Sequence, residues 1–135
     1  MNTPQSHLLL VEDDSLIAFD IARTLETESS LSVAVVKYDP KTILESIRHT
    51  RPDVILLEVY QCQEERFALM RQIADAGIPV IAGTVCDEYR DGVTGFEDVP
   101  VLIKPYDPGK LLSLLVTVIS TACTVETPRS QKIAS

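Results

Sequence analysis

Short runs of apolar residues recur along the chain and alternate with longer segments in which apolar residues follow a helical period. The runs have the length of β-strands, and most are continuously apolar, which is typical of strands buried on both faces of a sheet. The pattern therefore predicts buried strands at residues 8–11, 31–36, 54–57, 78–83 and 99–103.

The first segment between these strands has a clear helical pattern. Residues 15–28 follow Asp14, which is a good N-cap residue. Apolar residues recur at helical spacing along this segment and predict its buried face. They are Leu16, Ile17, Ile21 and Leu25.

Caps predict the other helices. The pairs Asp39-Pro40 and Asp107-Pro108 each combine an N-cap residue with proline at the first helical position, so a helix is expected to start at each. Residues 64–77 form a further helical segment, which Gly77 closes as a C-cap. Residues 86–98 contain two glycines and few apolar residues, so they predict a short helix or a loop.

The alternation of strands and helices predicts the fold class. Repeated strand–helix units form a doubly wound α/β domain with a parallel sheet and helices on both faces. Ligands of such domains bind outside the carboxyl ends of the strands. The residues that follow each strand are therefore the candidates for a functional site.

Composition narrows the class of protein. The chain has 135 residues, 45% of them hydrophobic, which fits one folded domain. Its net charge of −8 disfavours binding to nucleic acid phosphates or to an anionic membrane. Neither a signal peptide nor a membrane-spanning run is evident. Cys62, Cys86 and Cys123 form no CxxC pair, so we expect reduced thiols and a cytoplasmic protein.

Polar residues follow most of the predicted strands. The strand ends, in chain order, carry Glu12-Asp13-Asp14, Lys37-Tyr38, Glu58, Thr84 and Lys104-Pro105. Clustered carboxylates need a counter-charge, which Mg²⁺ supplies through oxygen ligands. A lysine and a hydroxyl suit a tetrahedral oxyanion such as phosphate. Asp14 alone is explained as an N-cap and Lys37-Tyr38 looks unremarkable, but the meeting of the others at one edge indicates a functional site.

Four separated motifs carry a family resemblance. VEDDS, PDVILLEVY, IPVIAGT and VLIKPYD are similar in order and spacing to the receiver domain of bacterial two-component response regulators. The resemblance covers residues 6–122 and leaves residues 123–135 as a flexible polar tail. It implies a flavodoxin-like (βα)5 fold with strand order 2-1-3-4-5, and a signalling module rather than an enzyme.

The resemblance also implies roles for the strand-end residues. Glu12 and Asp13 match the acidic pair that binds Mg²⁺, helped by the backbone carbonyl of Tyr60. Thr84 and Lys104 match the hydroxyl and the lysine that contact the phosphoryl group, and a cis-type proline bond follows this lysine.

Three features depart from the family pattern. Glu58 stands at the position of the phosphate-accepting aspartate, and Val101 stands at the position of the switch aromatic, three residues before the lysine. The helix region after the fourth strand is short. We expect the longer side chain of Glu58 to reach Lys104 and Thr84 and to imitate a phosphoryl group in part. Mg²⁺ binding is then expected to be weak.

The favoured hypothesis is a stand-alone pseudo-receiver of a two-component or phosphorelay pathway, not phosphorylated at Glu58 and acting through protein–protein contact. Expected partners are a histidine kinase, a phosphotransfer protein or an output protein. A second copy is another expected partner, bound through the fourth helix region, the fifth strand and the last helix. The alternatives are a conventional phosphorylatable receiver and, with less support, a Mg²⁺-dependent phosphohydrolase. The latter usually carries an Asp-x-Asp spacing that is replaced here by Glu12-Asp13-Asp14.

Overall fold

A computed structural model describes residues 5–134, with side chains described as far as residue 122. Its five-stranded sheet is parallel throughout, with the order β2-β1-β3-β4-β5. The predicted fold class and strand order are confirmed. The strands are β1 (His7–Val11), β2 (Ser32–Val36), β3 (Val54–Glu58), β4 (Val80–Thr84) and β5 (Val101–Ile103).

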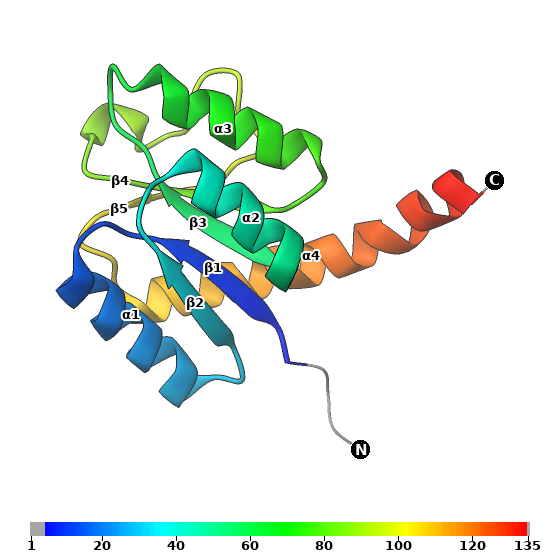
Figure 1. The fold of residues 1–135 in the computed structure, drawn as a ribbon, viewed down its shortest axis with the longest axis horizontal. Coiled ribbons are helices and arrows are strands. Elements are labelled where there is room, and N and C mark those ends of the chain that lie inside the picture. The colour runs from blue at the N-terminus through cyan, green and yellow to red at the C-terminus, as the bar shows by residue number, and fades with distance from the viewer. Residues whose placement is uncertain (1–4, 135) are drawn as a thin grey trace.

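Helices connect the strands and cover both faces of the sheet (Figure 1). The segment 86–98 holds a single short 3₁₀ turn, as predicted, and Gly77 beyond the third helix has the positive φ of 85° expected of a C-cap glycine. The helical elements are α1 (Ser15–Glu28), α2 (Pro40–Thr50), α3 (Glu64–Asp75), η1 (Asp87–Tyr89) and α4 (Pro108–Ala134).

Aspartate side chains start three of the helices, as the sequence predicts. Asp14 Oδ1 accepts hydrogen bonds from the backbone N–H groups of Leu16, at 3.0 Å, and Ile17, at 3.1 Å. Asp39 and Asp107 cap α2 and α4 in the same way. Each cap satisfies an amide that has no partner within its helix, which typically contributes about 1 kcal/mol.

The sheet separates two hydrophobic cores because successive strand residues point to opposite faces. In β1, Leu8 and Leu10 pack under α1 and α4, whereas Leu9 and Val11 pack under α2 and α3. The helices complete these cores with buried apolar residues, which are Ala18, Leu25, Leu111 and Leu115 on the first face and Ile43, Leu69, Met70 and Ile73 on the second.

The predicted buried face of α1 is wrong at its first turn. Leu16 is 82% exposed and Ile17 is 39% exposed, whereas Ala18 and Leu25 are buried. The Asp14 cap fixes where the helix begins, and therefore which residues point at the sheet. The resulting orientation of α1 places Ala18 in the core and leaves Leu16 and Ile17 facing outward.

The last helix is longer than expected. The sequence pattern predicts a flexible tail at residues 123–135, but helical backbone continues through Ala134 and extends beyond the sheet (Figure 1). The mobility of this segment stays a prediction. Within residues 5–134, no helix is both long enough and apolar enough to span a membrane.

Gly83 in β4 allows the segment after β5 to close over the sheet. The Lys104-Pro105 peptide bond is cis, as the resemblance implied, and Tyr106 follows it. Tyr106 packs against the core under α1 and α4, and its phenol group lies directly over Gly83. A Cβ atom at Gly83 would overlap the Tyr106 hydroxyl. A side chain at this position is therefore incompatible with the observed position of Tyr106.

We predict that Gly83→Ala destabilises the fold by about 1–3 kcal/mol, the usual cost of overpacking. Gly109→Ala is the matched control, because the nearest atom to its Cβ would be Asp107 Oδ2 at an ordinary 3.5 Å. Urea unfolding measures both changes. Equal losses from the two variants, or no loss from Gly83→Ala, would contradict this explanation.

Candidate functional site

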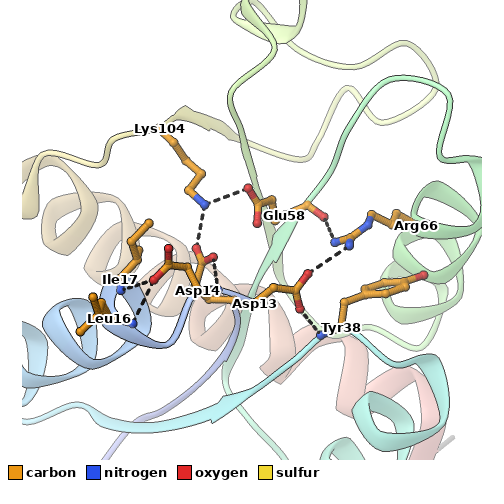
Figure 2. Close-up of polar contacts among 9 residues, drawn as sticks. Asp13, Asp14, Leu16, Ile17, Tyr38, Glu58, Arg66 and Lys104 are labelled. Carbon is orange, nitrogen blue, oxygen red and sulfur yellow. Dashed lines mark hydrogen bonds and ion pairs between the residues drawn. The ribbon is translucent and has the colours of Figure 1, made fainter.

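A lysine bridges two buried carboxylates at the carboxyl edge of the sheet (Figure 2). Lys104, directly after β5, places Nζ 2.8 Å from Glu12 Oε1 and 2.8 Å from Glu58 Oε2. Glu12 follows β1 and Glu58 ends β3. The two glutamates are only 4% and 3% exposed. The structure therefore contains the expected contact between Glu58 and Lys104.

The two glutamates keep Lys104 charged. Burial by itself would lower the pKa of this ammonium group, but the hydrogen bonds from Lys104 to Glu12 and Glu58 outweigh burial and raise the pKa. Removing one member of a buried ion pair leaves an uncompensated charge, which is strongly unfavourable. The three groups are therefore interdependent.

Both carboxylate oxygens of Glu12 have partners. Oε1 pairs with Lys104, and Oε2 accepts a hydrogen bond from the backbone N–H of Asp14 at 3.1 Å. Asp14 itself caps α1, which confirms the prediction that it is a helix N-cap residue.

Asp13 instead faces an arginine that the sequence analysis did not single out (Figure 2). Arg66, in the first turn of α3, places Nη2 3.4 Å from Asp13 Oδ2 and donates from Nη1 to the backbone carbonyl of Glu58 at 2.9 Å. Its guanidinium carbon lies 3.8 Å from the centroid of the Tyr38 ring. The other oxygen of Asp13, Oδ1, accepts a hydrogen bond from the backbone N–H of Tyr38 at 2.7 Å. The strand end at Tyr38, which looked unremarkable, belongs to the site.

The helical pattern did contain a signal for Arg66. This residue lies three, four and seven positions before Leu69, Met70 and Ile73, which places all four on one face of a helix. All four are buried. A charge at a core position of an amphipathic helix requires a partner, so the apolar spacing around an arginine indicates a buried polar site.

Where a magnesium site was expected, the acidic residues are paired with cationic side chains. Mg²⁺ needs oxygen ligands that converge in near-octahedral geometry. Glu12 is turned to Lys104 and Asp13 to Arg66, and no group of three or more His, Cys, Asp or Glu side chains in the described part of the chain is arranged to hold a metal ion. Two cationic side chains neutralise these carboxylates in the observed geometry, and the expected ligand set of Glu12, Asp13 and the Tyr60 carbonyl stays a prediction.

Thr84 and Val101 lie at their expected strand ends. Thr84 is fully buried, and its Oγ1 accepts a hydrogen bond from the backbone N–H of Cys86 at 3.0 Å. The described partner of the Glu58 carboxylate is therefore Lys104, and the described contact of the Thr84 hydroxyl is with Cys86. Val101 begins β5 and packs, partly buried, against the core under α2 and α3.

Two tyrosines border the carboxylates. Tyr60 lies with its ring centroid 5.0 Å from the guanidinium carbon of Arg66. Burial, followed by interaction with the Glu58 carboxylate, raises the pKa of the Tyr60 phenol. Burial and then the charge of Glu58 likewise raise the pKa of Tyr106. Both phenols are therefore held in the neutral form beside the negative charges.

Comparison with known proteins connects this architecture to a family, although no family model matches the chain. The transcriptional regulatory protein CseB of Streptomyces coelicolor is 32% identical over 118 residues, which cover 85% of this chain and 50% of CseB. The DNA-binding response regulator MtrA of Mycobacterium tuberculosis is 28% identical over 116 residues, which cover 84% of this chain and 50% of MtrA. This chain is a homologue of response regulators and has the receiver-domain fold.

The fold relationship is seen in a CheY-like receiver domain protein from Methanospirillum hungatei. Its crystal structure matches with a TM-score of 0.74 and 18% identity, covering 90% of this chain and 98% of that protein. The family resemblance inferred from the four motifs is confirmed. The chain spans about half the length of the two sequence relatives, so the activities of the whole relatives are not carried over to this chain.

The raised pKa values predict a loss of stability at alkaline pH. Tyr60, Tyr106 and Lys104 have folded-state pKa values above their unfolded values, which are about 10. The folded state therefore keeps protons that the unfolded state releases. This stabilisation is fully present below about pH 10 and is lost as the pH rises toward the folded-state pKa values.

Urea unfolding at increasing alkaline pH measures this loss, and Tyr60→Phe isolates one group. As the pH rises, the free energy of unfolding should fall less steeply in Tyr60→Phe than in the native protein. The difference between the two slopes should correspond to the release of about one proton fewer on unfolding. An identical slope in the two proteins would show that Tyr60 does not hold its proton more tightly in the folded state.

Proposed function

We propose that this receiver domain is an atypical signalling module whose output is contact with other proteins, without phosphoryl transfer at Glu58. The observation that supports the proposal is the bridge from Lys104 to Glu12 and Glu58, at 2.8 Å in each case. In the related family this lysine contacts the phosphoryl group. Here its ammonium group already has two carboxylate partners.

Glu58 is poorly suited to accept a phosphoryl group. Compared with aspartate, its extra methylene moves the carboxylate by about 1 Å, and a misplacement of that size can cost about 10²-fold in a positioned reaction. The carboxylate is also 4% exposed and paired with Lys104. Attack on a phosphodonor would require the carboxylate both to leave this ion pair and to become accessible.

The same geometry makes Glu58 a partial imitation of a phosphorylated aspartate. A carboxylate carries one negative charge, whereas a phosphoryl group carries nearly two and has three acceptor oxygens. A conformational equilibrium moves only by the difference in stabilisation between its two states. We propose that the bridge holds the domain in one state, closer to the active arrangement, and that Val101 in place of an aromatic ring blunts the usual readout.

The proposed partners are proteins of a two-component or phosphorelay pathway in the cytoplasm: a histidine kinase, a phosphotransfer protein or an output protein. The net charge of −8 argues against direct binding of nucleic acid by this domain, which we place at residues 6–122. The proposed contact face consists of residues 86–98, β5 and α4. It includes Val116, which is 53% exposed, and it also suits a second copy of the chain.

A conventional phosphorylatable receiver is the second candidate. The similarity to CseB and MtrA and the presence of Thr84 and Lys104 at the expected strand ends favour it. A Mg²⁺-dependent phosphohydrolase has less support, because Glu12 and Asp13 are turned to cationic side chains rather than to a shared metal position.

We predict that the native protein gains no phosphoryl group when it is incubated with a small-molecule phosphodonor and Mg²⁺, because Glu58 is too long and remains paired. Intact mass measures the outcome, with a conventional receiver as the positive control. A stoichiometric gain on the native protein that disappears in Glu58→Gln would establish the conventional function instead. If Glu58→Asp gains a phosphoryl group and the native protein does not, the extra methylene of Glu58 is what prevents phosphorylation of the native site.

We also predict that Val116→Glu weakens self-association or partner binding through the proposed contact face. The substitution adds a charge to an exposed apolar position on α4, whereas Gln72→Glu adds the same charge to an exposed position on α3, on the other face of the sheet. Sedimentation at high concentration compares the two variants. A native protein that stays monomeric, together with unchanged partner binding in Val116→Glu, would count against this face.

A further inference from the structure

Arg66 is a buried cation within the carboxylate cluster. It is 6% exposed, although its side chain starts from the first turn of α3. The guanidinium donates to the Glu58 carbonyl at 2.9 Å and lies 3.4 Å from Asp13 Oδ2, with one face on the Tyr38 ring. A guanidinium group stays charged at every ordinary pH, so this positive charge is permanent.

Each oxygen of the Asp13 carboxylate already has a partner within the protein. Oδ2 faces Arg66, and Oδ1 accepts a hydrogen bond of 2.7 Å from the backbone N–H of Tyr38. Asp13 is 49% exposed at its side chain, so solvent ions can approach it. What opposes a bound metal ion is therefore the guanidinium group beside the carboxylate, and not a lack of access.

The charges of the cluster divide into two groups. Lys104 balances Glu12 and Glu58, and Arg66 balances Asp13. A divalent ion on Asp13 would have to lie beside the guanidinium group or displace it. The first arrangement places two cations together, and the second leaves a buried arginine without its carboxylate, which is strongly unfavourable.

We propose that Arg66 is the resident cation of this site, that its guanidinium group occupies the carboxylate that would otherwise bind Mg²⁺, and that the cluster is therefore built to work without a divalent metal. The proposal concerns Asp13 and α3. It does not depend on whether Glu58 accepts a phosphoryl group, so mass measurements on Glu58 and metal binding at Asp13 test separate statements.

The test is a Mg²⁺ titration of the full chain followed by the backbone amide signals of Asp13 and Tyr38. A sodium chloride titration of equal ionic strength corrects for screening. The native protein should show no saturable response of these amides at millimolar Mg²⁺. Saturable binding at Asp13 by the native protein would overturn the proposal by itself, whatever the variants do.

Arg66→Gln removes the guanidinium group and should bind Mg²⁺ about tenfold or more tightly than the native protein, because it removes a like charge beside the ion. Arg71→Gln removes the same charge from the same helix, at an exposed position that contacts Gly95 and Phe96, and should leave Mg²⁺ binding unchanged. No gain in Arg66→Gln, or an equal gain in Arg71→Gln, would overturn the proposal.

Arg66→Met is the second variant if Arg66→Gln does not fold. It retains the apolar stem that packs on the Tyr38 ring and still removes the charge. The same gain in Mg²⁺ affinity is expected, and a folded Arg66→Met without that gain also counts against the proposal. If neither variant folds, the titration of the native protein decides.

Discussion

The ammonium group of Lys104 is the interaction on which the functional edge of the sheet depends. β5 is hydrogen-bonded only to β4 in the described sheet, yet Lys104 at its end reaches the carboxylates that end β1 and β3. The bridge therefore ties β5 to β1 and β3, two strands with which it does not pair. Both carboxylates are buried and the lysine is largely buried, so removing any one of the three charges leaves the others poorly compensated.

Arg66 extends this dependence to the helices. It connects α3 to Asp13 after β1, to the backbone of Glu58 in β3 and to the Tyr38 ring after β2. The strand ends on both sides of β1 are thus linked through one side chain. A receiver fold with this arrangement has its charge balance built from protein groups, and its geometry is fixed by the packing of α3 on the sheet.

The fold was predictable from the sequence because buried parallel strands and Asp-Pro helix starts have strong local signals. The meeting of Glu12, Glu58 and Lys104 was also predictable, since parallel strands bring their carboxyl ends to one edge. The role of Arg66 was missed although its spacing placed it on the buried face of α3, and its particular partners depend on how α3 docks. The exposure of Leu16 on α1 likewise depends on how that helix docks on the sheet, and the continuation of α4 to Ala134 was not predicted.

The long sequence separations across the Lys104 bridge have a consequence for folding. Lys104 lies 92 positions after Glu12 and 46 positions after Glu58. During synthesis both carboxylates emerge well before their counter-charge, and until then they need water as their partner. The edge formed by β1 and β3 must therefore stay hydrated until β5 is added. Burial of the two carboxylates therefore follows the addition of β5. A chain that ends before β5 would leave Glu12 and Glu58 exposed to water at the carboxyl edge of the sheet.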